Sequence, residues 1–255
     1  ELSIVKLSYM RLSYMIKSFM ILSNFKLGDK MRKIILSIIA ISSLFVLPVQ
    51  AVDKSIGLSL AYSTVDTKVT DDIDSNGTID TTKNISNDIG IPSLFLELTN
   101  QVGGANLSVG IDWIPISAEF DSRSTTQSSL KAAGDGAATS GTNKGTVDVS
   151  NHLTAYVRLG TQVTSDTEFY LVAGIAQADV EADVQSVSST NKKVDLDLDA
   201  EKLGVGIKRD LGGSFLKLEY AEVDYDPISV TTSNNTKVTG DIDTKNITLS
   251  VGRSF

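Results

Sequence analysis

The sequence predicts an all-β protein, an eight-stranded antiparallel up-and-down transmembrane β-barrel. Eight segments alternate apolar residues with small or polar ones, which is the two-residue period of β-strands. The gaps between them alternate between long and short, as in single-chain membrane barrels that have long loops at one rim and short turns at the other. Small and charged residues oppose the apolar ones in the central strands, so we expect a polar interior.

The predicted strands and their connections follow in order along the chain. The strands cover residues 55–69, 89–99, 105–120, 147–160, 168–184, 194–209, 214–225 and 241–255. The short turns pass through Gly103-Gly104, Ser165-Asp166 and Gly212-Gly213. The longer connections are residues 70–88, 121–146, 185–193 and 226–240.

The two faces of the second and third strands decide between a soluble and a membrane barrel. In the second strand, Leu94, Leu96 and Leu98 alternate with small or polar residues and one aromatic, namely Ser93, Phe95, Glu97 and Thr99. In the third strand the apolar residues are Leu107, Val109, Ile111 and Trp113, and the residues between them are Asn106, Ser108, Gly110 and Asp112. A β-sandwich or a lipocalin-like barrel would point its apolar residues inward and could not tolerate such a polar opposite face in a dry core. The pattern therefore predicts that the leucines contact lipid. Aromatic residues are placed to form two interfacial girdles, namely Tyr62, Trp113 and Tyr220 on the loop side and Phe169 and Phe255 on the turn side.

The sixth strand changes the face that carries its apolar residues. Leu203 and Val205 have one parity, whereas Leu196 and Leu198 have the other. A β-bulge near residues 200–202 would reconcile the two halves. The end of the fifth strand has a matching alternation of apolar and acidic residues, so we expect this hairpin to extend beyond the membrane as a two-faced ribbon.

Residues 31–51 have the features of a secretory signal peptide. Met31-Arg32-Lys33 is a basic start, and Val49-Gln50-Ala51 places small residues at the spacing of a signal-peptidase site. The apolar run between them has 14 residues, short of the roughly 20 that a transmembrane helix needs. We expect cleavage after Ala51, the alternative being a transmembrane helix that begins further upstream.

Residues 1–30 are interpreted as an over-extended reading frame rather than as structure, because they begin with Glu1 and repeat the sequence Leu-Ser-Tyr-Met. An amphipathic presequence is the alternative. The expected mature chain, residues 52–255, is then a single barrel domain of 204 residues.

The charge of the mature chain argues against a nucleic-acid partner. Residues 52–255 hold 16 basic and 29 acidic side chains, a net charge near −13, whereas phosphate binding needs a basic surface. Cysteine is absent, which excludes disulfides and thiolate metal sites.

The last strand carries Ile247, Leu249 and Val251 on one face and ends on the aromatic Phe255. This ending resembles the closing strand of bacterial outer-membrane barrels, although Arg253 departs from the pattern. With Asp112-Trp113-Ile114-Pro115 and Leu216-Lys217-Leu218-Glu219-Tyr220, the mature chain resembles the small eight-stranded outer-membrane β-barrel proteins, the opacity-type and OmpA-transmembrane-domain group. The resemblance implies a bacterial outer-membrane location, contact with outer-membrane lipid and lipopolysaccharide, and recognition of Phe255 as an assembly signal by the barrel-assembly machinery.

Charged residues of inward parity form the most informative candidate site. They are Glu97, Asp112, Arg158, Lys202, Lys208, Lys217 and Glu219. Because desolvated charges must be paired, we expect a salt-bridge network with Arg158 near Glu97 or Glu219. A structural role is favoured over a gate, since side chains can fill the interior of an eight-stranded barrel.

A calcium loop is a second candidate. Asp72, Asp74, Asn76, Thr78 and Asp80 occupy the ligand spacing of an EF-hand loop, but Lys83 replaces the bidentate glutamate. This spacing predicts at most weak calcium binding in the first outer loop, and an ordinary acidic turn is the alternative. No other cofactor is expected.

The sequence predicts a protein without catalytic residues. His152 is the only histidine, and it is followed two residues later by Thr154, where barrel-type lipid A deacylases have serine. We therefore expect a structural and surface-interaction role. The alternatives are a narrow or gated porin-like channel for small solutes or ions and, less favoured, an enzyme.

Overall fold

The computed structural model describes residues 52–72, 76–102, 104–131, 138–185, 192–231 and 237–255. The predicted signal peptide and the segment before it lie outside these residues. Within the described part of the chain, no helix combines the length and the apolar character needed to cross a bilayer.

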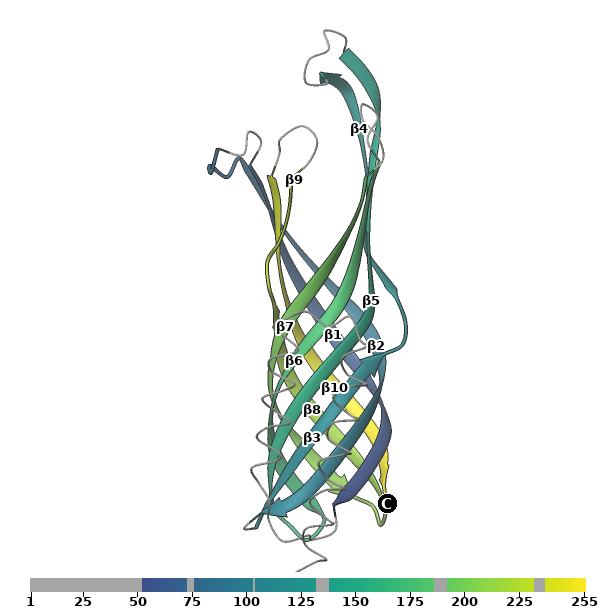
Figure 1. Ribbon diagram of the computed structural model, residues 1–255, viewed down its shortest axis with the longest axis vertical. Coiled ribbons are helices and arrows are strands. Elements are labelled where there is room, and N and C mark those ends of the chain that lie inside the picture. The colour runs from purple at the N-terminus through teal and green to yellow at the C-terminus, as the bar shows by residue number, and fades with distance from the viewer. Residues whose placement is uncertain (1–51, 73–75, 103, 132–137, 186–191, 232–236) are drawn as a thin grey trace, which may run out of the picture.

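The described residues form one antiparallel sheet of ten strands. They are β1 (Asp53–Asp72), β2 (Thr81–Val102), β3 (Ala105–Ile114), β4 (Ala118–Lys131), β5 (Ala138–Gln162), β6 (Thr167–Gln185), β7 (Lys192–Asp210), β8 (Ser214–Tyr225), β9 (Ile228–Thr231) and β10 (Lys237–Ser254). The barrel runs β1-β2-β3-β5-β6-β7-β8-β10 and closes where β10 pairs with β1, from Ser55 opposite Ser254 to Asp72 opposite Lys237. Within the described residues, β4 pairs only with β5 and β9 only with β10, beyond the closed wall. The predicted eight-stranded antiparallel barrel is therefore confirmed (Figure 1).

Several predicted boundaries are wrong on the loop side. The strand expected over residues 105–120 is divided, because β3 ends at Ile114, Pro115 follows it, and β4 begins at Ala118. Much of the long connections 70–88 and 121–146 belongs to β2, β4 and β5. These extensions are rich in Thr, Ser and Asn and carry no apolar face, so their sequence lacks the alternation from which strands are predicted.

The faces of the wall have the predicted orientation. Leu96 has 49% of its side chain exposed on the outside, whereas the next residue inward, Phe95, has 1%. The same exposed apolar band continues around the barrel, and it includes Ile56, Leu58, Leu60, Ile111, Leu159, Leu171, Val205, Ile207, Leu216, Leu218, Ile247, Leu249 and Val251. The five girdle aromatics are also exposed on this outer surface. Such a band on a closed barrel is the surface that lipid covers.

The bulge expected near residues 200–202 is wrong. β7 pairs with β6 without a register shift from Arg209 to Lys192, and its even-numbered residues face inward from Val194 to Lys208. Leu198 is buried inside, whereas Leu203 is exposed outside. The polarity of the faces reverses because the surroundings of the outer face change from lipid to water above the girdle.

Above the girdle the interior becomes a small apolar core. Ala178 and Val180 of β6 pack with Leu198 of β7, and further apolar side chains surround them. These are Val149, Leu196, Tyr225, Ile228 and Ile242. The cluster holds β5, β6, β7, β8, β9 and β10 together at the loop side of the barrel.

One part of the wall lacks a neighbour. β2 pairs with β1 from Thr81 to Thr99, but with β3 only from Leu94 to Val102. Among the described strands, none pairs with the other edge of β2 over residues 81–93, since β4 rises with β5 instead (Figure 1). We name this gap the β2/β4 opening. It begins directly above the Leu94–Trp113 pair, at the level of the loop-side girdle.

Lipid exposure of the outer face can be tested by charge at two depths. Leu96→Arg is expected to lower the free energy of unfolding by about 2 to 4 kcal/mol, because Leu96 lies within the apolar band, whereas Leu211→Arg at the turn rim is expected to cost about 0 to 1 kcal/mol. Urea titration of protein refolded into lipid measures both. Equal costs at the two positions would contradict the assigned band.

Candidate functional site

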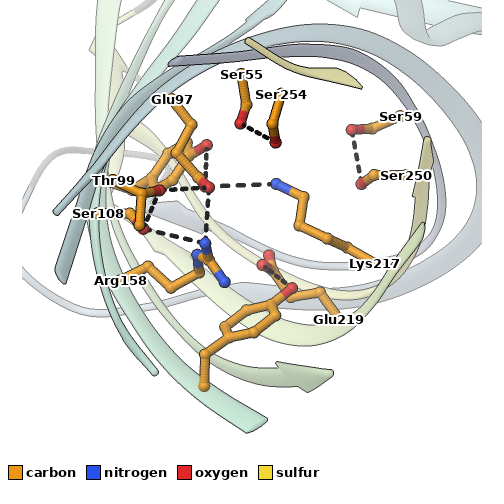
Figure 2. A network of polar contacts seen from close by, with 12 residues as sticks. Ser55, Ser59, Glu97, Thr99, Ser108, Arg158, Lys217, Glu219, Ser250 and Ser254 are labelled. Carbon is orange, nitrogen blue, oxygen red and sulfur yellow. Dashed lines mark hydrogen bonds and ion pairs between the residues drawn. The ribbon is translucent and has the colours of Figure 1, made fainter. Parts of the chain in front are cut away.

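An ion-pair network crosses the turn-side half of the lumen, and we call it the lumen network. Its centre is Arg158 of β5, with 1% of its surface exposed. The guanidinium donates from Nη2 to Glu97 Oε1 at 2.7 Å and from Nη1 to Glu168 Oε1 at 2.7 Å. Nη2 also donates to Ser108 Oγ at 3.0 Å (Figure 2). One cation thus joins β2, β3, β5 and β6 through a buried set of hydrogen bonds.

Lysines from the opposite wall complete the lumen network. Lys217 of β8 reaches across the lumen, where its ammonium lies 3.6 Å from Glu97 Oε2 (Figure 2). The same ammonium lies 3.7 Å from the centre of the Phe95 ring. Lys202 of β7 pairs with Glu219 of β8 at 2.6 Å, and Tyr170 donates to the same carboxylate at 3.1 Å. Buried charges remain ionised only when they are compensated in this way.

Four aromatic rings fill the remaining space, and each lies over a glycine on the neighbouring strand. The cross-strand pairs are Phe95 with Gly57, Tyr156 with Gly110, Tyr170 with Gly206, and Phe215 with Gly252. A Cβ atom at any of these glycines would lie within 2.4 Å of the partner ring. The glycines are therefore required so that the rings can lie flat against the wall and close the lumen.

The structure places the predicted lumen residues in different surroundings. Glu97, Arg158, Lys202, Lys217 and Glu219 are brought together in ion pairs. Lys208 instead lies over the Phe215 ring, 4.3 Å from its centre, and Asp112 lines the hollow above the network.

Sequence reasoning missed Glu168. This residue is the second of β6 and lies beside a turn, and it shares the inward parity of Tyr170 and Val172. That parity was the available signal. Two carboxylates, rather than one, compensate Arg158.

A cavity of about 450 Å³ lies on the loop side of the lumen network, and we call it the outer cavity. Lys217, Glu219 and Tyr156 belong to its floor, and Tyr225 and Val149 connect it to the apolar core above. The lumen is thus divided into a hollow that faces the loop side and a separate hollow at the turn-side mouth, which Lys208, Glu168 and Phe255 line.

His152 lies at the upper edge of the outer cavity. Its Nε2 atom is 3.0 Å from the Tyr225 hydroxyl across the lumen. The register of β5 against β6 shifts between Ser150 and Leu153, and Asn151 has a φ of 53°, so a local irregularity positions the ring. The partner of the imidazole is a tyrosine rather than an aligned serine or threonine nucleophile, an arrangement suited to a bridge across the lumen.

The predicted calcium loop is only partly described, since Asp74 lies outside the described residues. Both carboxylate oxygens of Asp72 accept backbone hydrogen bonds, from the amides of Asn76 at 2.9 Å and Gly77 at 2.8 Å. Asn76 Oδ1 accepts from the Thr78 amide at 2.8 Å. Asp80 is exposed. The bond from Thr78 to Asn76 is an Asx turn, whereas the two bonds to Asp72 span four and five residues and hold the loop together. Calcium binding in this loop stays a prediction.

The loop-side rim is acidic. Asp66, Asp224, Asp226, Asp241 and Asp243 line one surface hollow. Burial and the neighbouring Asp224 carboxylate raise the pKa of Asp243, with Asp241 and Asp66 adding to the effect. Because several carboxylates lie close together there, the rim is a region of negative potential that attracts cations.

Fold, band and filled lumen together define the class of protein as a transmembrane β-barrel of the outer-membrane type. No protein-family profile and no curated protein sequence matches the chain. Solved structures of similar fold include the outer membrane protein OprG from Pseudomonas aeruginosa, with 16% identity, a TM-score of 0.48 and coverage of 81% of this chain and 97% of that one. Neisserial surface protein A has 9% identity and a TM-score of 0.37, covering 79% and 97%. Ail of Yersinia pestis has 10% identity and a TM-score of 0.36, covering 78% and 99%. The likeness concerns the fold alone.

Removing the central cation tests the lumen network. Arg158→Met is expected to lower the free energy of unfolding by about 3 to 5 kcal/mol, because two buried carboxylates lose their guanidinium partner. The matched control is Lys245→Met, which breaks a 3.5 Å pair with Asp66 between side chains that are about half exposed and should cost less than about 1 kcal/mol. Urea unfolding measures the free energy of unfolding of both variants. A decrease for Arg158→Met as small as that for Lys245→Met would show that the lumen network is not needed for stability.

The ring-over-glycine packing is tested separately. Gly206→Ala would place a Cβ atom 2.4 Å from the Tyr170 ring and 2.8 Å from the Leu218 carbonyl oxygen, and it should cost about 1 to 3 kcal/mol by overpacking. Gly90→Ala is the control, since a Cβ atom there meets nothing within 4 Å. The two variants are compared by the same urea unfolding experiment, and indistinguishable midpoints would exclude tight packing at Gly206.

Proposed function

We propose that the protein is a structural and surface-interaction barrel of the bacterial outer membrane, with no enzymatic activity and with a lumen that does not conduct. The lumen network carries this proposal. Arg158, Glu97 and Lys217 extend from opposite walls and meet, and the rings of Phe95 and Phe215 lie beside them with centres 6.1 Å apart. A continuous column of water would have to break these contacts.

The extended strands support a role at the cell surface. β4 and β5 rise together far beyond the closed part of the barrel, at the end opposite the C-terminus (Figure 1). β1 and β10 also continue their pairing above the girdle, as far as Asp72 opposite Lys237. Paired strands of this length are stiffer than loops, so they can hold an interaction surface away from the membrane.

The proposed partners follow from the two surfaces that the barrel presents. The apolar band is suited to outer-membrane lipid and lipopolysaccharide. The terminal residue Phe255 is suited to the barrel-assembly machinery. Its backbone amide donates to Lys54 at 2.9 Å, which fixes the end of the chain at the seam of the barrel, while its side chain is exposed.

The absence of enzymatic activity is supported by the paired state of the interior. The buried carboxylates of Glu97 and Glu219 accept hydrogen bonds from cations and tyrosines, which leaves them poorly suited to act as general bases. His152 is engaged with Tyr225.

Planar-bilayer recording tests the closed lumen. Refolded protein is expected to give no steady conductance, whereas the double variant Lys217→Ala, Phe215→Ala should conduct because it removes two of the groups that fill the lumen. Heat-modifiable mobility on gels verifies that both proteins are folded. Steady conductance of the unaltered protein would overturn the proposal in favour of a narrow channel.

A further inference from the structure

We infer that the outer cavity is a binding site for a small neutral amphipathic molecule, one with an apolar body and a hydroxyl head such as an alcohol or a phenol, which enters through the β2/β4 opening. The volume of about 450 Å³ lies within the range of small-molecule sites in proteins. This inference goes beyond the proposed function, because a non-conducting barrel could exist with or without such a ligand.

The wall of the outer cavity is suited to an apolar body. Towards the opening, the inward-facing residues change from small and charged ones to isoleucines. Ile89 and Ile91 lie on the β2 side and Ile114 lies on the other side, where the half-exposed Ile116, after the end of β3, also reaches the lining. Val65, Val172 and Val223 continue this apolar lining deeper inside. Water cannot form hydrogen bonds with such a surface, whereas an apolar molecule is stabilised by contact with it.

Two buried polar atoms in the same wall have no hydrogen-bond partner. Ser63 of β1 has 0% of its surface exposed, and its Oγ atom is unpaired. Asn246 lies directly opposite on β10, and its Oδ1 atom is unpaired as well. A buried polar atom without a partner costs free energy. A hydroxyl head could donate to the Asn246 oxygen and accept from Ser63, which satisfies both atoms.

The charges at the floor favour a neutral head over an ionised one. Lys202 is paired with Glu219, and Lys217 lies near Glu97. Asp112 adds one further carboxylate to the lining. A ligand carboxylate would therefore meet Asp112 without a cation that is free to compensate both, and an ammonium group would lie close to the like charges of Lys202 and Lys217.

The β2/β4 opening gives a route that the two ends of the lumen lack. The lumen network closes the cavity on the turn side, and the apolar core with the His152–Tyr225 bridge lies above it. The opening begins at the Leu94–Trp113 pair, level with the loop-side girdle. Amphipathic molecules collect at that depth, where the apolar part of the bilayer meets its headgroups.

Three related probes test the ligand class. Binding of 1-naphthol, naphthalene and 1-naphthoate to refolded protein in detergent micelles is measured by calorimetry, with partition into protein-free micelles subtracted. We expect saturable binding of 1-naphthol, weaker binding of naphthalene, and no binding of 1-naphthoate above partition. Equal binding of 1-naphthoate and 1-naphthol would overturn the neutral-head assignment.

Variants locate the site. Ile91→Trp, which fills the cavity beside the opening, is expected to abolish the saturable binding, whereas the matched Leu96→Trp, on the lipid face of the same strand and away from the opening, should retain it. Ser63→Val and Asn246→Leu should each weaken 1-naphthol binding roughly fivefold, the loss of about one hydrogen bond, and should leave naphthalene binding unchanged.

Heat-modifiable mobility shows that each variant is folded before it is titrated. Binding of 1-naphthol that survives Ile91→Trp would overturn the inference, and so would the absence of saturable binding to the unaltered protein. Both results are independent of the conductance measurement, so failure of the binding site is distinguishable from failure of the closed-lumen proposal.

Discussion

Every feature of this barrel depends on the hydrogen bonding of its backbone in a medium without water. A strand that crosses lipid must have both edges paired, and the pairing of β10 with β1 closes the wall over the part that the apolar band surrounds. Closure with eight strands then fixes a narrow interior that side chains must fill. The apolar residues are required outside, so the interior receives the polar and charged ones, and these must compensate one another.

The lumen network is the solution that this chain uses. Arg158 takes two carboxylates, and Lys217 crosses from the other wall towards one of them. Glycines on neighbouring strands make room for aromatic rings, which exclude water between the charged groups and lower the local dielectric. Ion pairs in such surroundings are held firmly, because separating them would leave a desolvated charge. A filled lumen thus follows from the same constraint as the closed wall.

Paired strand edges and an apolar outer face are required only within the lipid, and the structure changes in two ways where the lipid ends. Above the lipid, the outward positions of β6 and β7 are acidic, and the inward positions hold apolar residues such as Val180 and Leu198, with no break in register. The wall can also lose a pairing, as it does along β2 above Leu94. An unpaired edge is tolerated at this height because water reaches it, and the opening leads to a cavity that combines apolar walls with unpaired polar atoms.

The number of strands in the wall, the lipid-facing parity and most of the inward charges were predictable from the sequence, because each follows from a two-residue period that holds wherever one face meets lipid. The sequence could not determine where strands end above the membrane, since polar strands in water carry no alternating signal. The bulge predicted near residues 200–202 was wrong for a related reason. Which face of a strand carries the apolar residues depends on whether lipid or water lies outside the wall, as well as on the direction of the side chains. The ion pair of Glu168 with Arg158 and the position of Ser63 beside a cavity were visible only in the three-dimensional structure. Which side chains meet inside a barrel depends on the stagger of its strands and on its closure, and no local sequence pattern contains that information.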